Sequence, residues 1–424
     1  NERRAFVVNE LQQFSRASQN NIMQVLEEGA SHGLVRELTS FWISNSIGCT
    51  MTRDMLNSIS QRNDILIIES DEYRNMLPEG ETSTRVQNSI SNSGSNSTAT
   101  NRGLAWHITQ VNADDVWNYN GASGYNGNGI IVAIVDTGVN YNHNDIKNNM
   151  WTNAQGYHGY DYVNSDNDPM DDNGHGSHCA GIVAGTGASG TQTGMAPGAK
   201  IMALKVLGAN GSGSNANIMS AMQYAINNHA DIISMSLGAS GDTGNASERQ
   251  LFVNMLNAGI IATLAAGNDG ENYSSANPND DGYYYSIPRN VGSPGNCPPP
   301  WHNPDQTLNG GTSAAVCVGS TNRNDRKSTF SSIGPVTWSG ISGYNDYPYT
   351  AGSSTNIGVI RPDIAVPGSD ITSLDYSGTN GYTEMCGTSM ATPGCAGIFA
   401  LMLSANPDLT PEQLDEIIET TAIP

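Results

Sequence analysis

Five short and mainly apolar runs constrain the fold of this 424-residue chain more than any other feature of its sequence. They are Ile130–Val135, Lys200–Leu207, Asp231–Leu237, Ile260–Ala265 and Ala314–Val318. Helical patterns lie between them, at Asn217–Asn228 and Ser247–Asn257. Strands that are apolar along their length are buried on both faces, which is typical of a parallel sheet covered by helices. The sequence therefore predicts an α/β fold with a mainly parallel central sheet.

Two more helices are predicted near the end of the chain. Residues Ser389–Ser404 are small and apolar nearly all round, as expected of a helix buried in a core. Thr410 begins a capping box that runs to Gln413, with Pro411 at the first helical position. An amphipathic helix is therefore expected from Pro411 onward.

The chain changes character near residue 80. Residues 82–103 are dominated by Ser, Asn and Thr, which is typical of an exposed linker. Before it, we expect strands at Leu34–Ser44 and Ile65–Glu69, and between them a helix over Thr52–Ser60 that Thr52 caps. The expected organisation is a small α+β domain (1–81), a linker (82–103) and a large α/β domain (104–424).

The charge balance restricts the partners of the protein. Lys and Arg number 18 against 40 Asp and Glu, which gives a net charge of −22. Such a field repels phosphates and anionic membranes, so we expect neither nucleic acid nor a membrane surface as a partner. The start, Asn1-Glu2-Arg3-Arg4, has no apolar leader, so we expect any signal peptide to be already removed or never present.

Four polar residues of the large domain are candidates for catalysis. Asp136 and Asn268 each follow an apolar strand, where open α/β sheets place their sites. His175 lies between two glycines just ahead of a helical pattern, and Ser389 begins the expected core helix. Each also has an ordinary explanation: a turn cap for Asp136, a turn amide for Asn268, a helix cap for Ser389, and metal ligation for His175 with His178. A metal site at His175 and His178 lacks a third ligand at useful spacing.

These four residues occur together in the order Asp, His, Asn, Ser, and in this combination the sequence resembles the subtilisin-like serine peptidases. The resemblance runs from about Trp106 to Ile423 through the motifs VAIVDTG, GHGSHCAG, SMSLG, TLAAGND and CGTSMATP. It implies a three-layer αβα domain in which Ser389 is the nucleophile, His175 the general base and Asp136 its orienting carboxylate. It makes the Asn268 side chain a donor of the oxyanion hole. The physics agrees, because a serine hydroxyl needs a neighbouring base to become an effective nucleophile.

The resemblance also implies how a substrate binds and how the enzyme is made. Two segments align with the strands between which relatives hold an extended peptide by backbone hydrogen bonds: Gly211, Ser212 and Gly213, and Ser236, Leu237 and Gly238. The region around Thr52–Glu69 is similar to the family's inhibitory propeptide. We therefore expect a secreted, self-processing zymogen that acts on polypeptides and is inhibited by its own propeptide. Residues 280–308 depart from the minimal family pattern and leave the primary specificity undetermined.

A calcium site is expected on the acidic loop before His175. The loop carries closely spaced carboxylates, and oxygen ligands of this kind suit calcium, although a solvated acidic loop is the alternative. A fifth carboxylate matches a ligand of the family's common calcium site, but residues 185–194 lack the usual Asn. The candidate ligands are Asp166, Asp168, Asp171, Asp172 and Asp145.

Three further hypotheses concern another peptidase class, a protein without catalytic activity, and a disulfide. Asp-Thr-Gly occurs at Asp136 and again at Asp242, which suggests an aspartic peptidase, but no apolar strand precedes the second copy. A catalytically silent pseudopeptidase that only binds peptides is the alternative to an enzyme. Finally, Cys297 and Cys317 flank the longer segment and are expected to form a disulfide.

Overall fold

The fold is built on a seven-stranded central sheet in which every pair of neighbouring strands is parallel. The computed structural model describes residues 2–77, 83–86 (backbone only), 103–119, 124–239, 241, 244–270, 285–307 and 309–423. Across the sheet the order is β16 (Ile364–Pro367), β13 (Ala315–Thr321), β12 (Ile261–Ala265), β11 (Ile232–Met235), β6 (Ile131–Asp136), β9 (Lys200–Lys205) and β7 (Gly159–Asp161). The five predicted strands are β6, β9, β11, β12 and β13, so the predicted α/β class is confirmed.

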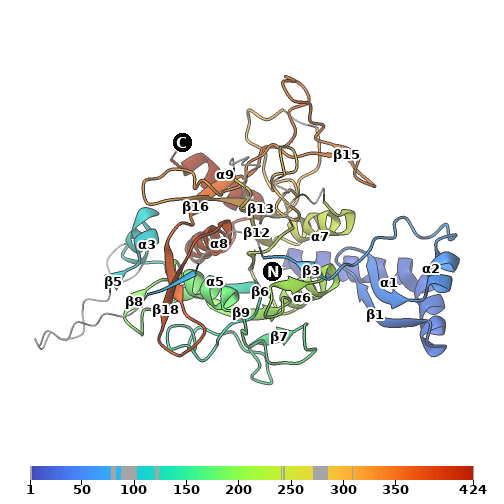
Figure 1. Cartoon of the computed structure of the whole chain (residues 1–424), viewed down its shortest axis with the longest axis horizontal. Helices are drawn as coiled ribbons and strands as arrows, with labels where there is room; N and C mark the ends of the chain where they lie inside the picture. The colour runs from blue at the N-terminus through green and yellow to red at the C-terminus, as the bar shows by residue number, and fades with distance from the viewer. Residues whose placement is uncertain are drawn as a thin grey trace, which may run out of the picture.

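Helices cover both faces of this sheet, which gives three layers (Figure 1). Along β6, Val132 and Ile134 pack in the cluster that contains α5 (His175–Ala184), α8 (Thr388–Ala405) and α9 (Pro411–Thr421). Ala133 and Val135 pack in the cluster that contains α6 (Asn215–Asn227) and α7 (Ala246–Asn257). This alternation explains why the strands are apolar throughout, since each successive side chain meets a helix layer.

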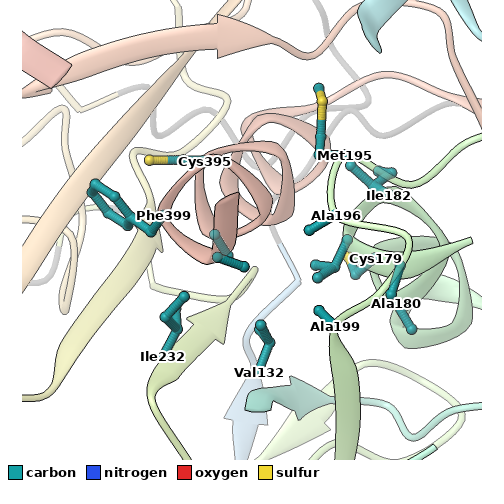
Figure 2. Packing of buried hydrophobic residues seen from close by; sticks show 14 of the residues in the cluster. Val132, Cys179, Ala180, Ile182, Met195, Ala196, Ala199, Ile232, Cys395 and Phe399 are labelled. Carbon is teal, nitrogen blue, oxygen red and sulfur yellow. The ribbon is translucent and has the colours of Figure 1, made fainter. Parts of the chain in front are cut away.

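Helix α8 is the centre of the first layer. Figure 2 shows α8, with Cys395 and Phe399, above Val132 and Ile232 of the sheet, and Cys179 and Ala180 of α5 on the other side of α8 in the same cluster. By length and composition α8 is apolar enough to cross a membrane, but 72% of it is buried inside the protein, as in the core helix of a soluble fold. The capping box before α9 forms as predicted, with the Thr410 side chain on the Gln413 N–H and the Gln413 side chain on the Thr410 N–H.

The N-terminal unit has more structure than the sequence indicated. A 30-residue helix, α1 (Glu2–Ser31), packs on a hairpin of β1 (Val35–Phe41) and β2 (Ser46–Met51), and α2 (Arg53–Ile59) follows with Thr52 as its cap. The predicted helix is confirmed, and the first predicted strand holds β1. The strand predicted at Ile65–Glu69 is wrong, because those residues form no regular element and Leu66 is 90% exposed.

Short strands connect the N-terminal region to the large domain. β3 (Arg74–Asn75) pairs with β10 (Ser212–Gly213), and β4 (Ser83–Val86) joins the edge of β18 (Tyr382–Met385), which pairs with β17 (Ile371–Leu374). β5 (Gly103–Leu104) pairs with β8 (Thr191–Gln192). The predicted linker therefore contains strand β4, although most of it lies outside the described residues. The remaining elements are α3 (Trp106–Gln110), α4 (Ala113–Trp117), β14 (Trp338–Ser339) and β15 (Asn345–Asp346).

The predicted disulfide is wrong in this structure. Cys297 and Cys317 are both free thiols, fully buried in the cluster that contains α6 and α7. Burial raises the pKa of each thiol well above its ordinary value, which keeps both protonated and unreactive.

Candidate active site

Asp136 and His175 are brought into direct contact at one edge of the sheet. Asp136 ends β6, His175 begins α5, and the Asp136 Oδ1 to His175 Nδ1 distance is 2.8 Å. The residue between the acidic loop and α5 is Gly174, at φ 113°, where a Cβ atom would lie 2.5 Å from the Tyr376 ring. A carboxylate only accepts, so Nδ1 carries the proton and Nε2 is left as the basic nitrogen. The pair is therefore oriented for general-base catalysis.

Ser389 lies in the first turn of α8, next to this pair. Its Oγ donates to the Ser236 carbonyl at 3.3 Å, and its own carbonyl accepts from the Ser236 hydroxyl at 2.7 Å. The Cys179 thiol of α5 joins the two helices, 3.5 Å from the Ser389 carbonyl and 4.0 Å from His175 Nδ1. The nucleophile candidate is thus fixed between the end of β11 and the helix that carries the base.

A metal site at the two histidines is not supported. His178 points away from His175 into the core, where its Nε2 is 3.0 Å from the Ile371 carbonyl and 3.2 Å from the Thr383 carbonyl. Burial lowers the pKa of His178 to about 3, so it is a neutral structural residue. Asp136, His175 and Cys179 do lie within metal-ligand reach of one another. However, burial raises the pKa of the Cys179 thiol, which opposes the thiolate that a metal prefers.

Asn268 presents an amide donor at the same place. Its Oδ1 accepts from the Thr388 N–H at 2.9 Å and from the Thr388 hydroxyl at 3.0 Å, so the carbonyl end of the amide is fixed. Its Nδ2 is buried, and it finds no hydrogen-bond partner within the described part of the chain. A buried N–H group without a partner is costly unless a ligand uses it. This is the arrangement expected of an oxyanion-hole donor beside Ser389.

The two predicted peptide-binding segments lie on either side of a piece of the chain itself. Arg74 and Asn75 pair antiparallel with Gly213 and Ser212. The Met76 N–H then donates to the Gly211 carbonyl at 3.0 Å, and the Met76 carbonyl accepts from the Gly238 N–H at 2.9 Å. Met76 is buried in the same cluster as Leu237, while Ser236 contacts Ser389 as described above. Residues 74–76 therefore lie between the two segments, and this position, which Ser236 links to Ser389, is called the groove below.

The structure does not gather the acidic loop into one metal site. Asp172 pairs with the buried Lys205 at 2.6 Å, and Asp168 accepts from the exposed Tyr141 hydroxyl at 2.6 Å. The Asp166 Oδ1 accepts from the Asp168 N–H. Among the residues that the structure describes, no group of three carboxylates, histidines or cysteines from this loop converges. The calcium site expected on Asp166, Asp168, Asp171 and Asp172 stays a prediction, and in this structure protein groups contact these side chains.

Asp171 and Asp145 are buried and are satisfied by the protein. Both oxygens of Asp171 accept from the segment that starts α5. The Asp145 oxygens accept from the Ser189 N–H at 2.6 Å and the Tyr382 hydroxyl at 2.7 Å. The protein itself therefore supplies a hydrogen-bond donor to each Asp145 oxygen in this structure.

Sequence reasoning missed Thr388, which holds the Asn268 amide. It named Asp171 only as a candidate metal ligand, whereas the Asp171 carboxylate also organises the segment before His175. The signal for Asp171 is its place four residues before His175, directly ahead of a helix that begins with glycine-flanked histidine. The second Asp-Thr-Gly copy, at Asp242, lies outside the described residues. The all-β fold of an aspartic peptidase is excluded by the parallel sheet with helices on both faces.

Comparison with known proteins agrees with this geometry. A model of the subtilase family matches residues 127–423. The serine protease AprX of Bacillus subtilis (strain 168) is 34% identical over 315 residues, which cover 69% of this chain and 61% of AprX. Thermitase of Thermoactinomyces vulgaris is 34% identical over 283 residues, which cover 66% of this chain and 76% of thermitase.

A solved structure supports the same relationship. The crystal structure of a cold-adapted subtilisin-like serine proteinase is 30% identical with a TM-score of 0.50, and the match covers 70% of this chain and 84% of that one. The chain spans less than two thirds of the length of AprX, as the 61% coverage states. Because the family model covers most of the large domain and several relatives exceed 30% identity, the chain belongs to the subtilase family.

Proposed function

We propose that this protein is a serine endopeptidase that is made as a secreted, self-processing zymogen. The observation that carries the catalytic part is the 2.8 Å contact of Asp136 Oδ1 with His175 Nδ1, next to Ser389 at the start of α8. In the proposed reaction, His175 Nε2 takes the proton of Ser389 as Oγ bonds to the carbonyl carbon of a peptide. The Asn268 amide and the Ser389 N–H stabilise the oxyanion. The proton then passes to the leaving amine, and water releases the acyl group by the reverse sequence.

An active-serine probe tests the catalytic proposal directly. A fluorophosphonate reacts only with a serine whose hydroxyl is activated, so we expect it to label Ser389 in the processed protein together with hydrolysis of a peptide library. Ser389→Ala is the control for specific labelling. Absence of labelling in folded, processed protein would favour the peptide-binding pseudopeptidase.

We also infer that the N-terminal unit is the inhibitory propeptide. Besides Met76 in the groove, Ile43 is fully buried in the cluster formed by α6 and α7, and the Ile43 carbonyl accepts from the Asn254 side chain. Asp71 Oδ1 accepts from the Asn215 N–H at 2.8 Å, which caps the N-terminus of α6. Such contacts hold the unit on the large domain while its tail occupies the groove.

The strand pairings also suggest where the chain is cut. β3 leads into the groove beside Ser236, whereas β4 pairs with β18, which ends four residues before Ser389. The nucleophile thus lies between the positions reached by β3 and β4. We propose that the enzyme cuts its own chain between Leu77 and Ser83, where the N-terminal unit meets the predicted linker. N-terminal sequencing of the processed protein checks this position, and a first residue beyond Ser83 would contradict it.

Residues 1–81 added in trans are expected to inhibit the processed enzyme at micromolar concentration. The inhibition should be competitive with peptide substrates, because Met76 binds the same backbone groups of Gly211 and Gly238. Met76→Glu is expected to weaken inhibition at least about tenfold, since it would place a charge in a buried apolar site. The assay is the inhibition constant of each piece, with Leu66→Ser as the control because Leu66 is exposed. Equal inhibition by the Met76→Glu and control pieces would contradict this role for Met76.

Subtilases commonly bind calcium, but no step of this proposal depends on it, because Asp168 and Asp172 are each engaged with a protein group. We therefore expect the wild type and Asp168→Ala to show the same change in melting temperature when an excess of chelator is added. The physical reason is that Asp168 is engaged with Tyr141 at the surface rather than with a cluster of carboxylates. Thermal unfolding with and without chelator provides the measurement. If the chelator lowers the melting temperature of the wild type but not that of Asp168→Ala, the acidic loop binds calcium and this expectation is wrong.

A further inference from the structure

The Asp171 carboxylate accepts five hydrogen bonds from neighbouring protein groups. Its Oδ1 accepts from the N–H groups of Asn173 and Gly174 at 3.0 and 2.9 Å, and from the Thr137 hydroxyl at 2.9 Å. Its Oδ2 accepts from the Ser177 N–H at 2.8 Å and the Ser177 hydroxyl at 2.6 Å. The residue is only 6% exposed. A buried carboxylate that accepts from five donors holds the segments that carry these donors in fixed positions.

These donors come from the two segments that carry the catalytic pair. Gly174 and Ser177 flank His175 at the start of α5, whereas Thr137 directly follows Asp136 at the end of β6. The Thr137 hydroxyl, which donates to Asp171, also accepts from the Gly176 N–H at 2.9 Å. The Ser177 hydroxyl likewise accepts from the Asn140 N–H at 2.8 Å. Asp171 thus ties the turn after β6 to the first turn of α5 on both sides of the Asp136 to His175 contact.

Two other features fix the same turn. Gly138 has φ 107°, and a Cβ atom there would lie 2.7 Å from the Pro169 carbonyl oxygen and 3.0 Å from the Asp171 nitrogen. On the other side, the buried Lys205 donates to the Thr137 carbonyl at 2.7 Å and to the Leu207 carbonyl at 2.9 Å. The backbone that bears Asp136 is therefore clamped between the acidic loop and β9.

We propose that Asp171 is a positioning residue for catalysis: its buried carboxylate, acting through Thr137 and the first turn of α5, sets the separation and orientation of Asp136 and His175. This inference rests on the proposed peptidase function. Asp171 does not touch the substrate, so its effect is on the rate of the chemical step rather than on binding. A displacement of about 1 Å in a catalytic group can cost about 10²-fold in rate.

Asp171→Asn tests the proposal, because it keeps the shape but turns two acceptor oxygens into one acceptor and one donor facing N–H groups. We expect kcat per probe-labelled serine to fall about 10- to 100-fold, with KM within about twofold of the wild type. Asp415→Asn is the matched control, since Asp415 is also fully buried but lies on α9. Its kcat and KM are expected to equal those of the wild type. Equal kcat for Asp171→Asn and the control, or a loss confined to KM, would overturn the proposal.

A pair of substitutions at Thr137 keeps the test decisive if Asp171→Asn does not fold. Thr137→Val preserves the volume and removes the hydroxyl that Asp171 holds, whereas Thr137→Ser retains it. We expect Thr137→Val to lower kcat about tenfold and to lower the apparent pKa of His175 in the pH profile of kcat/KM, because the imidazolium loses alignment with Asp136. Thr137→Ser is expected to behave as the wild type. Identical kinetics for Thr137→Val and Thr137→Ser would overturn the role of Asp171 through Thr137. A wild type that neither reacts with the probe nor hydrolyses peptides would instead overturn the proposed function itself.

Discussion

Ser389→Ala is expected to accumulate as the uncut full-length chain and to lose peptide hydrolysis by about 10⁶-fold in kcat, the size of loss known for the nucleophile of subtilisin, a protein of the same family. The hydroxyl is the only part of Ser389 that is removed, and its hydrogen bond to the Ser236 carbonyl is long at 3.3 Å, so the fold should be retained. Electrophoresis and N-terminal sequencing report the processing, and a fluorogenic peptide reports the turnover.

The host must lack other proteases for this result to be informative. Under that condition, a Ser389→Ala chain that is still cut between Leu77 and Ser83 would show that the cut is not autocatalytic. A second comparison separates cutting within one molecule from cutting between molecules. Active enzyme added to the Ser389→Ala chain should process it slowly, because residues 74–76 of each variant molecule already fill its own groove.

Asn268→Ala is expected to lower kcat by about 10²–10³-fold with little change in KM, a loss of the size known for the corresponding amide donor in subtilisin. The reason is that Nδ2 has no partner among the described residues of the resting protein, so its hydrogen bond becomes available to charge that develops on the substrate. Steady-state kinetics on the processed enzyme, normalised to the probe-labelled fraction, give the two constants separately.

Asn290→Ala is the control for the loss of an amide. Asn290 is buried and structural, since its Nδ2 donates to the Tyr285 carbonyl at 2.7 Å and its Oδ1 accepts from the Ile333 N–H at 2.7 Å. It should lower the melting temperature and leave kcat unchanged. If Asn268→Ala changes only the melting temperature as well, Asn268 is a structural amide and not an oxyanion donor.

The central sheet could be predicted from sequence because it follows from local patterns, whereas the candidate site residues depended on the combination of motifs. Strands covered on both faces must be apolar along their length, so β6 and β11 are visible as continuous runs. Asp136 and Asn268 each follow an apolar strand, where open α/β sheets place their sites, so both are candidates from sequence. The resemblance to the subtilisin-like peptidases implies their roles.

Other features depend on contacts that no local pattern contains. Helix α1 is long but weakly amphipathic, because Val7, Val8 and Leu11 pack against the large domain while Ile22 and Leu26 pack on the hairpin. The acidic loop has the composition of a calcium site. Its carboxylates differ only in their neighbours, with Asp171 turned inward to α5 and Asp172 paired with Lys205, which lies 33 residues later in the chain.

The division of apolar residues between the two units has a consequence for activation. Of the described residues, the N-terminal unit has a small buried cluster of its own (Ile22, Leu26, Val35, Met55 and Ile59) and a buried Phe41, whereas Ile43 and Met76 are buried against the large domain. A unit of this size with so small a core is marginally stable by itself. While the chain is intact, the covalent link keeps the effective concentration of the unit high. After the proposed cut, we expect dissociation to expose Ile43 and Met76 to water, so that the free unit unfolds. An unfolded chain is a substrate for a peptidase, so the proposed cut would not be reversed by rebinding of the unit.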